Sequence, residues 1–591
     1  MNTLSKVGLV LVTMFIVSCS DLTDLDINQN PNAPSPENAE IGFLYNKVQL
    51  AFAGTGTAVG TSTTADGDGF IPSTWAVTST ATRMRAMTSF FYREQYQDVS
   101  FNNMWNDAYS LMLPDVTAIE NLASEGTAFL YEANTARIMK AYVMTSLVDI
   151  FGDVPLAEAG LGTDQQNPAN QDGASIYAAA EELLDQAIAG LAEATTSPSN
   201  DLFYGGDKSK WITLANTLKL RIYNNTRLVD QSAGSKMMAI ISAGDFIDDE
   251  SEDFEFQFSS NRNDPDGRHP FYDTDYEQTD GGYMNNYYMW LLVGDKPMRD
   301  PRTRFYFYRQ QSVFSEANIN INDWDCVITN NPFDQIPPGS LDHVFAVDPN
   351  LPFCIAAADG YMGRDHGNGQ GIPPDGPLRV EYGVYPAGGR WDNNSFANTQ
   401  NSGIDGALGE GIQPIWQSSW TDFIRAEAAL TAGTGEDARA LLESAVRKSI
   451  AKVLSFQANV PAADLNAVIA SDPVTGEQIF ADVLIPTEDD IDAYVAEVMS
   501  RFDASSDKLD VVMTEYYIAI WGNGIESYNN YRRTMKPNNM APLIDPLAAS
   551  SASFPRTMLY PAVNVNLNQN ATQKNTDTQV FWDTNPAGAI R

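Results

Sequence analysis

The residue types used in enzyme catalysis occur in this chain without the spacing that catalysis requires. The histidines, His269, His343 and His366, are isolated, and the sequence has neither an HExxH zinc motif nor a GxSxG nucleophile motif. The 76 Asp and Glu residues allow a glycosidase pair of carboxylates in principle, but no local pattern singles one out. We therefore expect a protein that is not an enzyme and has no catalytic residue and no cofactor.

Two acidic stretches contain part of what a cation site needs. Asp66 and Asp68 lie in the run DGDG, which resembles the start of a calcium loop, but the glutamate expected at the end of such a loop is absent. An ordinary Gly/Asp turn is the better interpretation. Asp365 and His366, with Asp375 nearby, are a weaker alternative for holding a divalent ion. The sequence predicts no metal site.

Two stretches have the residue types that a site for a sugar ring would need. A pyranose ring has an apolar face of C–H groups and a belt of hydroxyls, so it needs a flat aromatic side chain with carboxylates, amides or arginines beside it. A long Gly/Thr-rich loop leads into Trp75, and residues 280–290 (DGGYMNNYYMW) interleave aromatics with amides and an acid. A core anchor is the alternative role for Trp75 and Trp290, because large aromatics are commonly buried. The predicted ligand-binding residues are Trp75, Asp66, Asp68, Asp280, Tyr283, Asn286, Tyr288, Trp290, Tyr361 and Trp391. Tyr361 and Trp391 are the weaker candidates.

Helical patterns flank these stretches. In residues 129–151 apolar side chains recur at helical spacing, and Gly152 and Pro155 predict where the helix ends. Lys219 and Arg221 belong to a later helical segment and are predicted to form structural ion pairs. Helices are expected at residues 42–52, 105–123, 129–151, 176–191, 213–228, 420–431 and 436–454.

Residues 261–414 differ from both flanks in composition. They hold 14 of the 31 prolines and 21 of the 63 aromatic residues in about a quarter of the chain, with several Gly-rich runs. Proline and glycine at that density preclude long helices. We expect a loop-rich ligand-binding lobe between an N-terminal helical-pair region (39–260) and C-terminal helices with a closing segment (415–591), all in one domain.

The N-terminus predicts export and a lipid anchor. Residues 1–18 read as a signal peptide whose apolar core is too short to span a bilayer, and Cys19 follows Ile16-Val17-Ser18, which resembles the bacterial lipobox. Residues 19–38 then form the lipidated cysteine and a flexible, Pro-rich tether. In an exported protein, Cys326 and Cys354 are predicted to form a disulfide, and two buried free thiols are the alternative.

The formal net charge of −40 restricts the possible ligands. Nucleic acid and anionic lipid headgroups would be repelled, so neither is expected as a partner. Strongly anionic polysaccharides are disfavoured for the same reason. A local basic patch could override the global charge, and the candidates for one are Arg83, Arg85, Arg299, Arg302 and Arg304.

Several motifs are shared with a known family. They are ARIMKAY and DIFGDVP within residues 136–155, YGGDKSKWITLANTLKLR at 204–221, and EYYIAIWGNGIESYNNYRRT at 515–534. These motifs resemble the SusD/RagB family of outer-membrane nutrient-binding lipoproteins of Bacteroidetes, and the resemblance runs from Cys19 to Asn568. It implies a mostly α fold, in which a tetratricopeptide-like scaffold of helical pairs (an α/α superhelix) carries a large loop-rich irregular lobe.

The resemblance also implies a function. SusD-like proteins are anchored by lipid in the outer membrane, face the extracellular side, and deliver a captured oligo- or polysaccharide to a SusC-like TonB-dependent transporter. In the family, the ligand platform is assembled from an early loop and the irregular lobe. Two alternatives remain open: a surface polysaccharide-degrading enzyme, and a peptide-binding member of the same fold.

Overall fold

The computed structural model describes residues 40–54, 69–124, 126–159, 165–263, 266–278, 282–312, 339, 341–354, 356–357, 359–369, 379–398, 402–471, 473, 475–586 and 588–590. The signal peptide, the tether, Asp66, Asp68, Asp280 and Cys326 therefore lie outside the described residues. No helix within the described ranges is long and apolar enough to cross a membrane.

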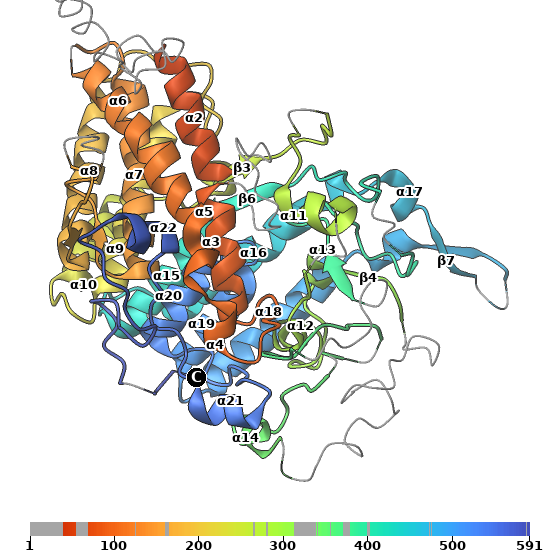
Figure 1. The fold of residues 1–591 in the computed structure, drawn as a ribbon. Helices are drawn as coiled ribbons and strands as arrows, with labels where there is room; N and C mark the ends of the chain where they lie inside the picture. The colour runs from red at the N-terminus through yellow and green to blue at the C-terminus, as the bar shows by residue number, and fades with distance from the viewer. Residues whose placement is uncertain are drawn as a thin grey trace, which may run out of the picture.

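The N-terminal helices stand side by side and form one end of the molecule (Figure 1). They confirm the predicted helical segments, with ends shifted by a few residues. α7 packs against α8, and α8 packs against α9, as expected of helical pairs. The elements are α2 (Ile41–Ala53), α3 (Phe70–Ala81), α4 (Tyr92–Gln95), α5 (Asn102–Asn106), the π-helical turn η3 (Asp107–Met112), α6 (Leu113–Ala123), α7 (Leu130–Phe151), α8 (Gly173–Glu193), α9 (Lys208–Thr226) and α10 (Ala233–Ala243).

Local sequence explains where these helices begin and end. α7 ends at Gly152, whose φ of 75° favours glycine, and Pro155 follows in the short strand β1 (Val154–Pro155), which pairs with β2 (Asn170–Gln171). Asp172 caps α8 by accepting a hydrogen bond from the backbone N–H of Ser175. The expected end of α7 is thus confirmed.

A helix takes the place of the last part of the expected early loop. α3 begins at Phe70, so Trp75 lies in the middle of a helix and not at the end of a loop. The segment FIPSTWAVTSTA is rich in Thr, Ser and Val, which are weak helix formers. Nearly every side chain of α3 is buried, and the helix packs against α2, α5 and α20. Tertiary packing has overridden local propensity.

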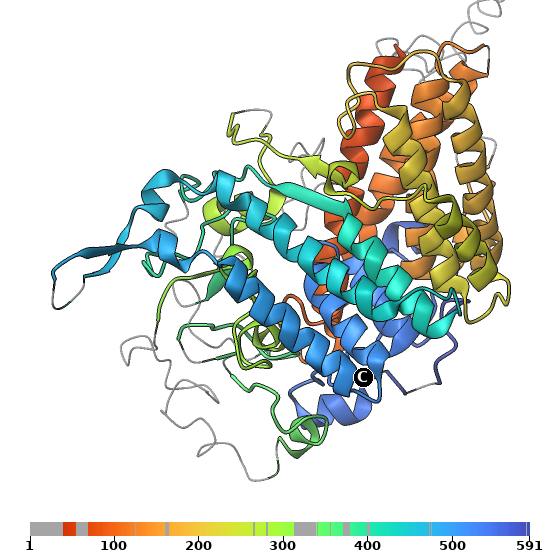
Figure 2. The same cartoon turned by 180° about the vertical axis from the view of Figure 1, so that it is seen from behind.

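The C-terminal helices pack across the base of the N-terminal group (Figures 1 and 2). α19 and α20 are separated by a tight turn at Gly522, whose φ is 101°, and Asn523 caps α20. The elements are α15 (Ser418–Thr431), α16 (Ala438–Ser455), α17 (Ala462–Leu465), α18 (Glu488–Ala504), α19 (Lys508–Ala519), α20 (Gly524–Thr534), α21 (Pro546–Ser551) and α22 (Ala562–Leu567).

The described part of the lobe consists of short helices and two-stranded antiparallel sheets. β3 (Phe254–Gln257) pairs with β6 (Ile412–Trp416), so the chain is joined where it enters and leaves the lobe. β4 (Phe307–Arg309) pairs with β5 (Val380–Tyr382). The hairpin of β7 (Val468–Ser471) and β8 (Gln478–Phe480) projects from the molecule (Figure 2). The short helices are α11 (Pro270–Asp273), the π turn η6 (Thr274–Gln278), α12 (Asn286–Val293), α13 (Thr303–Tyr306) and α14 (Asp342–Phe345).

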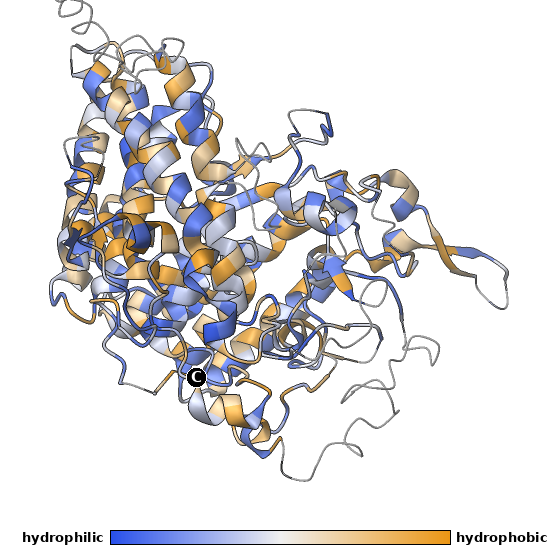
Figure 3. Ribbon diagram, in the orientation of Figure 1, coloured by the Kyte–Doolittle hydropathy of each residue, from blue (hydrophilic) through white to orange (hydrophobic). Residues whose placement is uncertain are grey.

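One large apolar cluster runs through both helical groups and into the lobe. Apolar and polar residues are interspersed along the helices (Figure 3), and peripheral helices such as α8 bury one face, whereas α3, α7 and α20 are buried almost all round. The two predicted ion pairs are confirmed. Arg221 is buried and bonds to Glu526 at 2.6 Å and Asp149 at 3.0 Å, and Lys219 pairs with Asp185. The mostly α, tetratricopeptide-like scaffold expected from the sequence is the fold observed.

Candidate ligand-binding site

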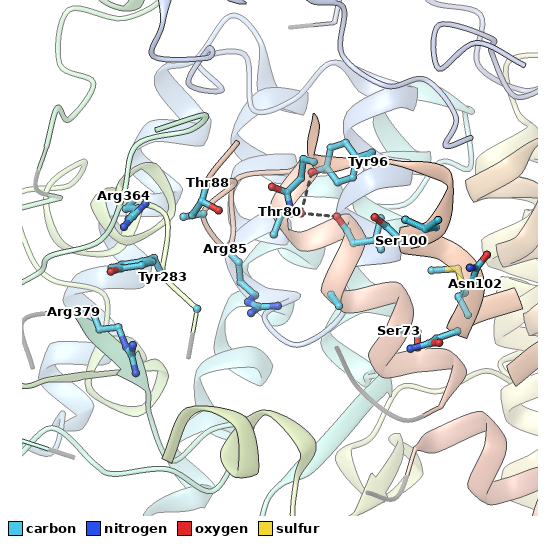
Figure 4. A pocket seen from close by; sticks show the side chains of 18 residues that line it. Ser73, Thr80, Arg85, Thr88, Tyr96, Ser100, Asn102, Tyr283, Arg364 and Arg379 are labelled. Carbon is cyan, nitrogen blue, oxygen red and sulfur yellow. Dashed lines mark hydrogen bonds between the residues drawn. The ribbon is translucent and has the colours of Figure 1, made fainter. Parts of the chain in front are cut away.

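A pocket of about 800 Å³ lies between the N-terminal helices and the lobe. One wall comes from α3 and from residues 95–104, and the other comes from residues 85–88, Gly282, Tyr283, Arg364 and Arg379. Figure 4 shows Arg364, Tyr283 and Arg379 on one side, hydroxyl and amide side chains on the other, and Arg85 between them. The volume lies within the range of about 300–1,000 Å³ typical of small-ligand sites.

Backbone hydrogen bonds hold the basic side of the pocket together. The N–H of Ala86 donates to the carbonyl of Tyr283 at 2.8 Å, and the N–H of Arg364 donates to the carbonyl of Met284 at 3.0 Å. The N–H of Val380 donates to the carbonyl of Met362 at 3.0 Å. Four chain segments that are far apart in sequence thus lie edge to edge, and three of their arginines line the pocket.

Each of these arginines has a defined neighbour. The Arg364 guanidinium stacks on the ring of Tyr283 at 4.0 Å, and that of Arg85 lies 5.2 Å from the ring of Phe271. Arg379 forms an ion pair with Glu381 at 2.7 Å. Stacking holds the planar guanidinium by its faces, whereas its N–H donors point outward in the plane of the group. Such a group can be fixed in place and still direct donors toward a ligand.

A buried carboxyl group lies behind two of the arginines. Asp275 is completely buried, and burial raises its pKa, while Arg379 and Arg85 act in the opposite direction. Neither Asp275 nor Glu381 lines the pocket.

The opposite wall is polar but uncharged. Its hydroxyl and amide groups belong to Ser73, Thr80, Tyr96, Ser100, Asn102 and Asn103. The hydroxyls of Thr80 and Tyr96 lie 2.9 Å apart, and Ser73 donates to Asp107 at 3.3 Å. Apolar contacts come from Ala76, Val77 and Met104. This mixture of hydroxyls, amides and small apolar surfaces suits the edge and face of a sugar ring.

Tyr283 is the predicted site residue that the structure places in this pocket. Its phenol oxygen is buried and makes no hydrogen bond to the part of the chain that the structure describes.

Two predicted aromatic platforms are core residues instead. Trp75 is 1% exposed, its indole N–H donates to the Tyr382 hydroxyl at 3.1 Å, and its ring packs edge-on against Trp521. Trp290 is 6% exposed and belongs to the same apolar cluster. The predicted role of both as solvent-facing platforms does not fit this placement. The alternative that we raised for them, a core anchor, describes their positions.

The remaining described candidates are also buried. Asn286 donates to Asp365 at 2.8 Å, and Tyr288 donates to the carbonyl of Ile518 and stacks on Trp521. Tyr361 lies between the guanidinium groups of Arg299 and Arg309, and Trp391 packs near Phe305. The fold uses these residues to build the lobe. Their predicted contact with a ligand does not fit these positions.

The predicted basic patch is divided in the structure. Arg85 lines the pocket, whereas Arg83 is buried against backbone carbonyls and the Tyr92 hydroxyl. Arg302 pairs with Asp300 at 2.6 Å. Arg299 and Arg304 pair with Asp359 and Asp392. Arg83, Arg299, Arg302 and Arg304 are therefore held within the fold and do not line the pocket.

Arg364 and Arg379 were missed by the sequence analysis. Both lie in the stretch GYMGRDHGNGQGIPPDGPLRVEYG, where the Gly content indicates loops. The alternation RVEY marks a short strand and places Arg379 and Glu381 on one face. That signal locates the strand but does not show what lies opposite it.

The proposed cation ligands are engaged elsewhere. Asp365 accepts hydrogen bonds from Asn286 and from the N–H of Cys354, and burial raises its pKa to about 6. His366 lies 3.0 Å from the Tyr92 hydroxyl, and Asp375 lies outside the described residues. Among the described residues, no group of three potential metal ligands comes together. Cys354 is disulfide-bonded. Its pairing with Cys326 stays a prediction, because residue 326 is not among the described ones.

Two family models match the chain and decide its classification. A model described as "Starch-binding associating with outer membrane" matches residues 61–323, and one described as "Susd and RagB outer membrane lipoprotein" matches residues 403–585. The chain belongs to the SusD/RagB family. The resemblance read from the sequence motifs is thereby confirmed. The sequence matches no curated protein.

Solved structures of SusD-like proteins share the fold. A chitin-binding protein superposes with a TM-score of 0.62 at 18% identity, covering 92% of this chain and 100% of its own. A SusD-like protein of Bacteroidetes gives 0.61 at 18% identity, with coverage of 93% and 100%. A SusD-like protein from Bacteroides thetaiotaomicron gives 0.59 at 17% identity, with coverage of 92% and 99%. At such identities the similarity establishes the fold alone.

Proposed function

We propose that this SusD-like protein is a lipid-anchored binding protein of the cell surface that captures an oligo- or polysaccharide and passes it to a SusC-like TonB-dependent transporter. The pocket beside Tyr283 supports the binding role most directly. It combines an aromatic ring, hydroxyl and amide groups and arginines within about 800 Å³. The lipid is attached at Cys19, and the protein faces the extracellular side of the outer membrane.

The lining of the pocket favours binding over hydrolysis. Glycoside hydrolysis normally requires two carboxyl groups on either side of the scissile bond. None of the described lining residues is Asp or Glu. This composition supports a role in capture without turnover.

A variant of the pocket tests the binding role. Tyr283→Ala should lower glycan affinity by about tenfold or more, a loss of about 1.4 kcal/mol, because it removes the aromatic ring that borders the pocket. Affinity electrophoresis on a glycan panel measures the change. Tyr204→Ala is a matched control, because this tyrosine is half-buried beside Trp211 and is absent from the pocket lining.

Three outcomes would contradict the proposal. Release of reducing sugar from a polysaccharide panel would identify a degrading enzyme. Binding of peptides and of no glycan would identify the peptide-binding alternative. Isolation of the native protein only as a free monomer, with no TonB-dependent barrel co-purifying from detergent-solubilised outer membrane, would remove the transporter from the proposal.

A further inference from the structure

The charge of the pocket lining is opposite to that of the protein. Asp and Glu outnumber Lys and Arg by 76 to 36 in the whole chain. The described lining residues include three arginines and no Asp or Glu. Because most charged residues of the chain are acidic, a lining with three arginines and no described acidic residue is unexpected. The fold therefore concentrates positive charge in this pocket.

The three arginines are held in position before any ligand arrives. Arg85 lies next to Ala86, whose N–H bonds to Tyr283, and Arg364 bonds through its own N–H to Met284. Arg379 adjoins β5, which pairs with β4 and bonds to Met362. Tyr283 and Phe271 stack against two of the guanidinium groups. A preorganised cluster loses little side-chain freedom on binding and therefore retains more of its interaction energy.

Among the described residues, two carboxyl groups lie close to the cluster, and neither lines the pocket. Glu381 pairs with Arg379, and Asp275 is buried beside Arg379 and Arg85. At the far end, Asp107 accepts a hydrogen bond from Ser73 and is not part of the lining. The described groups that face the pocket thus present guanidinium donors, hydroxyls and amides to whatever enters.

We propose that this pocket selects an anionic saccharide, with a uronate carboxylate or a sulfate ester bound by Arg85, Arg364 and Arg379 while a sugar ring packs on Tyr283. Guanidinium groups bind planar oxyanions through paired N–H donors, which is stronger and more directional than contact with a point charge. The inference rests on the proposed function, because it specifies the class of glycan that the site captures.

The global charge of −40 does not prevent this selection. At physiological ionic strength the Debye length is about 8 Å, so most of the distant surface charge is screened at the pocket. Contacts at hydrogen-bond distance in a partly enclosed site are screened much less. Local charge therefore decides affinity, and the long-range field mainly slows the approach of the anion.

Matched ligands test the inference on the unmodified full chain in detergent. The probes are a galacturonate tetramer, the same tetramer with its carboxyl groups reduced to alcohols, a sulfated galactose tetramer and a tetraglutamate peptide. We expect at least one acidic sugar to bind ten times more tightly, or better, than the reduced tetramer by titration calorimetry. Preference between the galacturonate and the sulfated tetramer identifies the source of the anion.

Variants locate the effect. Arg364→Gln should remove most of the preference for the acidic tetramer, whereas Arg439→Gln, which makes the same change in net charge at an exposed ion pair with Asp503, should leave it intact. Equal affinity for the acidic and reduced tetramers would overturn the inference and leave the proposed function standing. Failure of both acidic tetramers to bind would also overturn it. Binding of tetraglutamate and of no saccharide would overturn the proposed function as well.

Discussion

At the scale of single residues, an aromatic side chain in a predicted binding stretch has two very different uses. Trp75 is surrounded by core residues and bonds through its indole N–H to Tyr382, whereas the ring of Tyr283 borders the pocket and stacks on Arg364. Both residues were predicted from the same reasoning about sugar rings. What separates them is the set of neighbours supplied by distant parts of the chain.

Trp75→Ala should therefore destabilise the protein severely. Removing a fully buried indole leaves a cavity, and such changes cost about 3–5 kcal/mol of unfolding free energy. Urea unfolding followed by circular dichroism measures the loss. Tyr283→Ala enlarges an existing pocket instead and should cost much less. Equal destabilisation by the two variants would show that Tyr283 is also a core residue.

His269 should make the protein less stable in mild acid. Burial lowers its pKa to about 3, so the folded state keeps the ring neutral while the unfolded chain takes up a proton near pH 6.5. The folded-state pKa is depressed, and the stability present above pH 6.5 is lost progressively as the pH falls toward 3. At pH 5.5 the loss amounts to about 1.4 kcal/mol.

His269→Asn tests this pH dependence. The ring accepts a hydrogen bond from the N–H of Phe271 at the start of α11, and asparagine can cap a helix in the same way without titrating. The variant should show a shallower fall in unfolding free energy between pH 7.5 and 5.5 than the wild type. Identical slopes would mean that His269 takes up its proton in the folded state as readily as in the unfolded chain.

At the scale of elements, buried ion pairs join helices that the sequence alone cannot place together. Glu427 of α15 bonds to Arg533 of α20 at 2.6 Å and to Arg227, just after α9, at 2.7 Å. Asn224 of α9 also donates to it at 2.8 Å. Arg533, in the YRRT motif at the end of α20, therefore has a structural role, because it is buried in this cluster.

Glu427→Gln should cost about 3–5 kcal/mol of unfolding free energy, because it leaves two buried guanidinium groups without their counter-ion. Burial alone would raise the pKa of Glu427, but Arg227 and Arg533 outweigh it and lower the pKa to about 2. The wild type should therefore lose the stabilisation from this carboxylate as the pH falls from about 4.5 to 2. The variant should lack that part of the acid transition. Glu436→Gln, in a partly exposed pair with Arg425, is the control.

The helices were predictable because their evidence is local, and the binding site was not. Periodic apolar residues and a terminal glycine are sufficient to place α7, α8 and α16 within a few residues. The pocket depends on backbone bonds among segments near residues 85, 284, 364 and 380. No periodicity within one segment encodes such contacts. For the same reason α3 was read as part of a loop, since its helical state depends on packing against α20.

At the scale of the whole molecule, a helical frame supports a lobe with little regular structure of its own. The lobe is closed at its base by β3 and β6 and is tied internally by short strand pairs and single bonds. Asp365 links two of its parts, because it accepts hydrogen bonds from both Asn286 at the start of α12 and the N–H of Cys354. Arg364, the residue that precedes Asp365, lines the pocket. The disulfide-bonded Cys354 is therefore linked through Asp365 to the residue beside it that lines the candidate pocket.

Reduction of the disulfide should weaken both the lobe and its affinity for ligand. With Cys19 lipidated and Cys326 paired with Cys354, mature protein should show no free thiol under denaturing, non-reducing conditions, and two after reduction. In the chain-entropy model, closing this loop stabilises by roughly 3–4 kcal/mol. Because the loop is anchored through Asp365 next to Arg364, reduced protein should bind the acidic tetramer more weakly and melt at a lower temperature. Cys326→Ser should reproduce both effects without reductant. Two free thiols before reduction would disprove the pairing, and unchanged affinity after reduction would show that the lobe holds Arg364 without it.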